Sequence, residues 1–403
     1  MSPRPLSGIR IADLTHYWSG PHAMRILSDL GAEVVKIEYP PRMCVLRGRF
    51  REPERFNGFA RWHQVNRNKR SVTLDFKRER HRELFWDLVR HSDVIAENSR
   101  GGVMKALDLT YERAREVKPD IIMLSMPACG AKGPWSGYAG VGGSLEPLSG
   151  LQSLTAYDQS GKRMRIKEAD VISGILGACA VLTALRHRKR TGRGQAIDLS
   201  QLEALSHTMM GAHFLEYAMN REQTLPLGNR HPIHAPQGCY PCKGEDKWIA
   251  LVIRREEEWR ALCELAGRPE WKEDERFRSR EARRAHHDEL DRLIGAWTAE
   301  YEHRELMRSL QQKGIAAGAV FNLKELSDDE HLDARGFFPS DEASGKRYPG
   351  LPGGSSDWGP LIRRRGPDLG ADNEWLSLEL LGRAKEDVPG FEPEEIGSGY
   401  DSE

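Results

Sequence analysis

The chain has 403 residues, enough for two or three domains at roughly 150 residues each. Lysine plus arginine and aspartate plus glutamate each number 60, so the net charge is zero and the basic excess needed to coat nucleic acid or an anionic membrane is absent. With 39% hydrophobic residues the chain can build a sizeable core, and no apolar run approaches the about 18 residues of a membrane span. The chain starts in a strand pattern without a signal peptide, so we expect a soluble cytoplasmic protein.

The first forty residues predict a strand, a helix and a second strand. Residues 9–14 alternate as a strand does, Pro21 stands where a helix begins, Gly31 ends that helix, and residues 34–38 form the next strand. Similar elements follow at residues 71–76 (strand), 78–91 (helix), 93–97 (strand), 111–117 (helix) and 121–125 (strand). Strands that alternate with helices indicate a parallel sheet covered by helices on both faces.

A long helix is predicted from Asp170, because apolar residues recur at helical spacing up to a basic run at residues 186–194. That run complements the helix dipole and is only a weak indication of nucleic-acid binding, which we do not expect. A strand at 195–200 and a helix at 201–219 complete this part of the chain.

From Gly228 the pattern changes to short strands and charged helices, which predicts a smaller α+β domain. Its expected elements are strands at 238–243, 248–253 and 316–321 and helices at 256–266, 280–300 and 303–313. Beyond about residue 330 glycine and proline are frequent, a last helix is expected near 374–381, and the tail from Lys385 is expected to be mobile.

Two histidines and two cysteines, His231, His234, Cys239 and Cys242, lie close together and suggest zinc. Their spacing is shorter than that of the usual zinc finger, and two prolines stiffen the segment. We therefore favour a loop that leads into a strand and expect no metal site.

Dinucleotide binding is the first function that a strand–helix–strand start suggests. Glu38 ends the second strand, where such proteins hold the ribose. The turn at residues 16–21 lacks the G-x-G-x-x-G motif, however, and Gly140–Gly143 lacks the third glycine at the required spacing. Neither a P-loop nor a G-x-S-x-G motif is present, so NAD binding, kinase-like activity and serine hydrolysis are all disfavoured.

Several segments, in order, resemble the family III CoA-transferases, the group of formyl-CoA transferase and carnitine CoA-transferase. They are Leu14–Pro21, Asp29–Glu38, Asn66–Asp75, Asp93–Asn98, Gly133–Pro134, Leu148–Leu151, Arg190–Gln195, Gly228–Pro232 and Leu369–Gly370. The resemblance covers nearly all of residues 5–382. It implies a Rossmann-like α/β large domain from residues 1–225 together with 331–403, a small α+β domain from 226–330, and a homodimer of interlocked subunits.

The resemblance also implies a catalytic residue, Asp170, which opens the helix after the Leu-Ser-Gly-Leu segment. A carboxylate there is stabilised by the helix dipole and by free N–H groups, although a lone aspartate at this place is more often an N-cap. The implied reaction moves CoA from an acyl-CoA donor to a free organic acid through an aspartyl anhydride and an aspartyl-CoA thioester. CoA is a co-substrate, and no other cofactor or metal is implied.

The same resemblance assigns the contacts to CoA to five segments. The residues concerned are Trp18, Ser19, Tyr39, Leu74, Asp75, Phe76, Lys77, Asn98, Ser99, Arg100, Ala139, Gly140 and Val141. Trp18 and Ser19 line the CoA and acyl site, and Tyr39 and residues 74–77 hold the nucleotide end. Residues 98–100 lie near the pantetheine and phosphates, and residues 139–141 face the thioester.

Departures from the formyl-CoA transferases alter the expected substrate. Trp18 stands where those enzymes have glutamine, and Gly142 stands where they have a glutamate, which leaves Glu146 as a nearby substitute. Their glycine run over the site is absent, and residues 228–236 supply an alternative lid. We therefore expect an organic acid bulkier than formate or oxalate.

Two rival functions remain. An α-methylacyl-CoA racemase shares the fold but needs two acid–base groups, and its histidine is replaced here by Val141. A non-catalytic acyl-CoA-binding relative is the other rival, and the retention of Asp170 argues against it.

Overall fold

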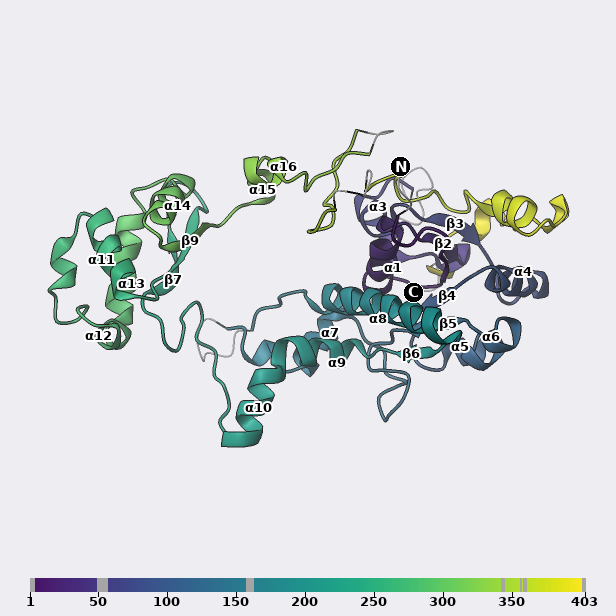
Figure 1. Ribbon diagram of the computed structural model, residues 1–403, viewed down its shortest axis with the longest axis horizontal. Helices are drawn as coiled ribbons and strands as arrows, with labels where there is room; N and C mark the ends of the chain where they lie inside the picture. The colour runs from purple at the N-terminus through teal and green to yellow at the C-terminus, as the bar shows by residue number, and fades with distance from the viewer. Residues whose placement is uncertain are drawn as a thin grey trace. The chain divides into compact units, whose positions relative to one another are not determined.

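The computed structural model describes residues 4–48, 57–156, 163–341, 345–355, 357 and 361–400. The chain divides into two compact units (Figure 1). The large unit comprises Met1–Gln152, Arg165–Gln223 and Asp333–Glu403, and the small unit comprises Ser153–Met164 and Thr224–Leu332. The expected boundaries differ from these mainly in the segment Ser153–Met164, which groups with the small unit although it precedes Asp170 closely in sequence.

The large unit contains a six-stranded sheet in the order β3-β2-β1-β4-β5-β6, and every neighbouring pair is parallel. The strands are β1 (Arg10–Asp13), β2 (Glu33–Glu38), β3 (Arg70–Thr73), β4 (Val94–Glu97), β5 (Ile122–Ser125) and β6 (Ala196–Asp198). This confirms the predicted Rossmann-like α/β fold. The strand order reverses between β1 and β4, and ligands of such sheets bind beyond the carboxyl ends of the strands at this point.

Successive strand residues face opposite sides of the sheet, and both sides are buried. Ile11 packs in the core cluster that contains Met24 and Val181, whereas Ala12 packs in the one that contains Leu84 and Phe85. The first cluster belongs to α1 (Ser19–Asp29) and α8 (Ala169–Thr191), and the second to α4 (Glu79–Arg90) and α6 (Tyr111–Val117). The other helices of this part are α3 (Ala60–Asn66), α5 (Val103–Ala106), α7 (Gly142–Leu148), α9 (Gln201–Leu205) and α10 (Gly211–Asn220).

Helix α8 is long and apolar enough, by length and composition, to cross a membrane, so the expectation that no such run exists was wrong. Small residues on this helix allow close packing instead. A Cβ atom on Gly174 would lie 2.6 Å from His22 Cδ2 on α1, and one on Gly177 would lie 2.7 Å from Met126 Sδ. These contacts explain how the helix is held against α1 and the end of β5.

Two other expectations for the large unit also need correction. The helix expected at 201–219 changes to a π-helical turn over Ser206–Met210 between α9 and α10, and the last helix is a π-helical segment, Trp375–Leu380. The tail that we expected to be mobile contacts the sheet loops. Phe391 packs edge-on against Tyr39 at 6.4 Å, and Gly397 donates its N–H to the Pro40 carbonyl at 3.0 Å.

The C-terminal segment also protects the edge strand β3. The Ser71 N–H donates to Asp372 Oδ2 at 2.8 Å, and the Thr73 N–H donates to Asn373 Oδ1 at 2.8 Å. An exposed edge strand presents such N–H groups to other chains. The side chains of the last part of the chain therefore replace a seventh strand.

The small unit has an antiparallel sheet in the order β7-β8-β9, formed by β7 (Gln237–Pro241), β8 (Trp248–Val252) and β9 (Ala316–Ala319). Its helices are α11 (Glu256–Leu265), α12 (Arg280–Ala285), α13 (His287–Thr298), α14 (His303–Gln312) and α15 (Leu323–Ser327), and α16 (Glu330–Ala334) follows where the two units meet in sequence. The single helix predicted at 280–300 is broken at His286, whose φ of −112° and ψ of 31° are not helical.

Candidate active site

Asp170 is the second residue of α8, so it lies among backbone N–H groups that have no partner within the helix. One turn later, Gly174 contacts the start of α1, because a Cβ atom there would lie 2.9 Å from the Ser19 carbonyl oxygen. The start of α8 is thereby fixed beside the carboxyl end of β1, where the strand order reverses.

Gly142, the first residue of α7, lies directly against the Asp170 carboxylate. A Cβ atom on Gly142 would lie 2.8 Å from Asp170 Oδ2 and 3.4 Å from Arg165 Nη2. Any side chain at this position would have to displace one of these groups. The glycine therefore leaves a small space that Asp170 and Arg165 both face.

Glu146 supplies a second carboxylate from the same short helix. Its side chain is fully buried, and Oε1 accepts the Glu168 N–H at 3.1 Å. Oε2 lies 3.5 Å from Arg165 Nε and has no hydrogen-bond partner among the described residues. The site thus combines two carboxylates with one guanidinium that is about half exposed.

Burial raises the pKa of Asp170 above the usual aspartate value. The Arg165 guanidinium lowers this pKa, and the Glu146 carboxylate raises it further. A carboxylate with a raised pKa is less stable as an anion and, once ionised, is a stronger nucleophile. The surroundings of Asp170 therefore suit attack on an acyl carbon better than those of an exposed N-cap.

The pH dependence of the reaction follows from these charges. We expect kcat/KM for an acyl-CoA to fall at acid pH, with an apparent pKa above 3.8, because Asp170 must be ionised to attack. Glu146→Gln removes a neighbouring anion and moves this acid limb to lower pH, whereas Arg165→Gln moves it to higher pH. Rate profiles from about pH 4 to about pH 8 measure the shifts. Identical limbs in all three proteins would contradict this electrostatic account.

The segments predicted to contact CoA follow the carboxyl ends of five strands. Trp18 and Ser19 follow β1, Tyr39 follows β2, Leu74 to Lys77 follow β3, Asn98 to Arg100 follow β4, and Ala139 to Val141 lie in the long connection after β5. Parallel strands place all these ends at one edge of the sheet. The residues are therefore gathered at the edge that includes the start of α8.

Some of these residues have structural partners that occupy their side chains. Asn98 Oδ1 accepts the His16 N–H at 2.6 Å, and its amide donates to the His16 carbonyl at 2.8 Å, so Asn98 ties the loop after β4 to the loop after β1. Leu74 is fully buried in the core and offers a ligand only its backbone. Lys77 and Arg100 are exposed.

Glu38, the residue typical of a ribose site, is not available to a ligand. Both of its oxygens accept hydrogen bonds from Arg47, at 2.9 and 2.7 Å, and both side chains are fully buried. This pairing agrees with the sequence argument against a dinucleotide.

Arg165 belongs to no sequence motif that marks it as a site residue. An arginine five residues before a predicted nucleophile is a weak signal, because Arg163 and Lys167 flank it with the same charge. Only the folded chain distinguishes Arg165 from these neighbours, by placing its guanidinium next to Gly142 and Gly143.

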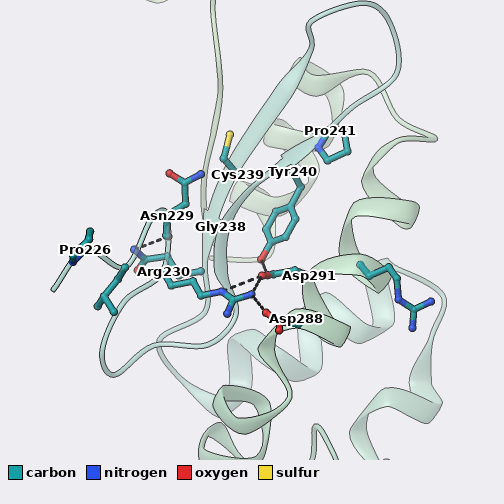
Figure 2. A pocket seen from close by; sticks show the side chains of 12 residues that line it. Pro226, Asn229, Arg230, Gly238, Cys239, Tyr240, Pro241, Asp288 and Asp291 are labelled. Atoms are coloured by element: carbon teal, nitrogen blue, oxygen red, sulfur yellow. Dashed lines mark hydrogen bonds and ion pairs between the residues drawn. The ribbon is translucent and has the colours of Figure 1, made fainter. Parts of the chain in front are cut away.

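The small unit contains a cavity of about 740 Å³ beside the segment 228–236 (Figure 2). Arg230 pairs with Asp288 at 2.5 Å and with Asp291 at 2.6 Å, and the Tyr240 hydroxyl donates to Asp291 at 2.8 Å (Figure 2). Arg230 therefore anchors its segment to α13. That the segment acts as a lid remains a prediction.

His231 and His234 stack with ring centroids 4.6 Å apart, and His231 Nδ1 accepts the Ile233 N–H at 3.1 Å. Within the described residues no group of three or more His, Cys, Asp or Glu side chains is arranged to hold a metal ion. The stacking and the turn account for the two histidines as parts of a loop.

Comparison with known proteins identifies relatives along almost the whole chain. The family model described as CoA-transferase family III matches residues 6–373. Succinyl-CoA–D-citramalate CoA-transferase of Chloroflexus aurantiacus is 31% identical to this chain over 398 residues, which is 96% of each chain. Succinate–glutarate CoA-transferase of Agrobacterium fabrum is 31% identical over 356 residues, which is 86% of this chain and 88% of that protein. The crystal structure of a CaiB/BaiF family protein from Brucella suis has a TM-score of 0.85 at 27% identity and covers 94% of this chain and 100% of the other.

Proposed function

The chain belongs to CoA-transferase family III, and on this premise we propose that it moves CoA from an acyl-CoA to a free carboxylic acid with Asp170 as the covalent nucleophile. The observation that carries the proposal is the position of the Asp170 carboxylate. It lies at the first turn of α8, with a raised pKa, facing a space bordered by glycine backbone. Relatives at 31% identity are CoA-transferases, which supports the same reaction class here.

The proposed reaction proceeds by acyl transfer to and from Asp170. The carboxylate attacks the thioester carbonyl of the donor, which forms an aspartyl–acyl anhydride and releases CoA thiolate. The thiolate attacks the aspartyl carbonyl, releases the donor acid and leaves an aspartyl-CoA thioester. The acceptor carboxylate then attacks this thioester to form a second anhydride, and the released thiolate attacks its acyl carbonyl to give the new acyl-CoA and free Asp170.

Each step passes through a tetrahedral oxyanion next to the start of α8. Backbone N–H groups of the first turn have no partner within the helix and carry the positive end of its dipole, so they stabilise developing negative charge. The Arg165 guanidinium adds a positive charge near the carboxylate. This arrangement stabilises charge that is larger in the transition state than in the bound ester.

We further propose that the large domain binds CoA along the carboxyl edge of the sheet. The exposed Lys77 and Arg100 are the cations of the predicted set that remain accessible to phosphate groups. Trp18 is the N-cap of α1 and Ser19 its first residue, and the Ser19 carbonyl lies against Gly174, one turn after Asp170, which supports assigning both residues to the thioester end. Tyr39, Asp75 and Phe76 would then accompany the nucleotide end.

The acids in the names of the relatives, succinate, citramalate and glutarate, are dicarboxylic. We propose a small dicarboxylic acid as the acyl group or the acceptor here. This substrate class agrees with the expectation of an acid bulkier than formate.

We also propose a cytoplasmic homodimer. Helix α10 has no buried residue, and its Phe214, Leu215, Tyr217 and Met219 are exposed, the last by 76%. Exposed apolar side chains gathered on one helix indicate a surface that another chain covers, and a second copy is the partner that the family resemblance implies. Light scattering that gives a monomer mass would contradict it.

A hydroxylamine trap tests the covalent mechanism. Hydroxylamine attacks acyl anhydrides and thioesters, so incubation with the enzyme and an acyl-CoA should convert Asp170 to its hydroxamate. Mass spectrometry of the peptide that contains Asp170 measures the adduct, with free CoA in place of acyl-CoA as the control. If transfer proceeds while no peptide is labelled, the covalent route is wrong; exchange of the α-proton with solvent, without CoA transfer, would instead indicate a racemase.

A further inference from the structure

Arg165 presents unused hydrogen-bond donors to the space in front of Asp170. Its Nε faces Glu146 Oε2 at 3.5 Å, and no hydrogen bond of its guanidinium is recorded among the described residues. A Cβ atom on Gly143 would lie 3.2 Å from Nη1 and 3.4 Å from Nη2, so both terminal nitrogens lie along the glycine backbone. A guanidinium whose Nε faces a carboxylate keeps its two terminal nitrogens available to bind a ligand carboxylate with two parallel hydrogen bonds.

The position of this guanidinium relative to the nucleophile fits a particular ligand. One point beside Gly142 lies 2.8 Å from Asp170 Oδ2 and 3.4 Å from Arg165 Nη2, so the carboxylate and the cation face the same space. The structure records no ion pair between the two residues in its described part. The space between them can therefore hold a ligand group that reaches both residues.

We propose that Arg165 binds the distal carboxylate of a dicarboxylic acyl group and so selects dicarboxylic over monocarboxylic CoA esters. In a succinyl group the two carbonyl carbons are separated by two methylene carbons, a span of roughly 4 Å with ordinary C–C bonds. That span places one carbonyl at Asp170 while the other reaches the Nη atoms of Arg165. The inference rests on the proposed CoA-transferase function and names the residue that recognises the distal carboxylate of the substrate.

The buried Glu146 contributes to this selectivity. Glu146 Oε1 accepts the Glu168 N–H, and Oε2 faces Arg165 Nε. This carboxylate therefore orients the arginine and leaves the terminal nitrogens of the guanidinium available to a ligand. A flexible lysine supplies the charge but not the two parallel donors. We therefore expect Arg165→Lys to retain only part of the preference.

Comparison of two donors of equal length distinguishes substrate selection from a general electrostatic role. Succinyl-CoA and butyryl-CoA have four-carbon acyl groups and differ in the distal carboxylate. In a ping-pong reaction, kcat/KM for the donor is set before the acceptor binds, so a single acceptor serves for both. The wild-type enzyme should prefer succinyl-CoA. Arg165→Gln should lower kcat/KM for both donors, because it removes a positive charge beside Asp170. The loss for succinyl-CoA should exceed that for butyryl-CoA by on the order of 10- to 100-fold, as the additional loss of one charge-assisted interaction predicts.

Arg163→Gln is the matched control, because Arg163 is an exposed arginine two residues away that donates to the Ser153 carbonyl at 3.1 Å. This variant should leave kcat/KM unchanged for both succinyl-CoA and butyryl-CoA. Equal losses for both donors in Arg165→Gln, or no preference in the wild-type enzyme, would overturn the inference and leave the CoA-transferase function standing. Absence of CoA transfer from either donor to any acid of a mono- and dicarboxylic panel would overturn the proposed function itself.

Discussion

Asp170→Asn should lower the rate of CoA transfer by roughly 10⁴-fold or more, the size of loss expected when a covalent nucleophile is removed. The amide has nearly the same shape as the carboxylate, so it keeps the contact with Gly142, but it carries no charge and cannot form the anhydride. The steady-state rate with an acyl-CoA and a free acid measures the loss. A rate within tenfold of the wild type would mean that another group is the nucleophile.

The stability of the same variant separates catalysis from folding. Burial raises the folded-state pKa of Asp170, so any stability that protonation of this group provides is present at acid pH and is lost as pH rises through the folded pKa. The ionised carboxylate therefore disfavours the fold at neutral pH, and the neutral amide should leave Tm unchanged or slightly raised. CoA should bind with similar affinity. The exposed Asp328→Asn is a control for the chemical change alone, and a large drop in Tm for Asp170→Asn would make its inactivity uninformative.

Asp29→Ala should have the largest effect on stability, about 3–5 kcal/mol, because it leaves buried cations without their partner. Asp29 is fully buried and accepts hydrogen bonds from Arg67 and Asn68, each at 2.7 Å, and from Arg25 at 3.3 Å. Urea unfolding measures the free energy of unfolding. If the variant does not accumulate as folded protein, Asp29→Asn, which retains hydrogen-bonding capacity but not charge, should show a smaller loss of the same sign.

Glu116→Ala is the matched control for this prediction. Glu116 pairs with Arg113 at 2.6 Å, a shorter distance than most buried pairs, but the two side chains are 64% and 49% exposed. Exposed ion pairs contribute about 0–1 kcal/mol, since water screens them and holding both side chains costs entropy. Equal losses for the buried and the exposed variant would show that burial does not decide the contribution.

The sheet and the position of Asp170 at the start of α8 were predictable because each depends on local pattern. The apolar run that leads into β5 (Ile122–Ser125) lies between helices, as expected of a buried parallel strand. A carboxylate at a helix start is recognisable once the flanking segments resemble a family. The break at His286 and the π-helical turn at Ser206–Met210 were missed because hydrophobic spacing continues through both. Tertiary contacts, which periodicity does not encode, decide these details.

The site was predicted only in part, for a similar reason. The loops at the strand ends were found from motifs, but motifs do not reveal which side chains the protein itself uses, as with Asn98 and its bonds to His16. Arg165 was missed because its role depends on Gly142 and Glu146, which come from another helix. The tail after Lys385 was expected to be mobile because its few apolar residues are isolated in sequence. In the structure, however, the Phe391 ring packs against the Tyr39 ring.

The protection of β3 by Asp372 and Asn373 has a consequence for synthesis of the chain on the ribosome. All six strands of the large sheet are translated before Thr224–Leu332, the main part of the small unit, and the side chains that accept the Ser71 and Thr73 N–H groups are translated after it. A nascent chain therefore carries an open sheet edge throughout synthesis of the small unit. Premature termination after residue 332 would leave that edge permanently open to pairing with other strands, so truncated chains should aggregate rather than persist as stable fragments.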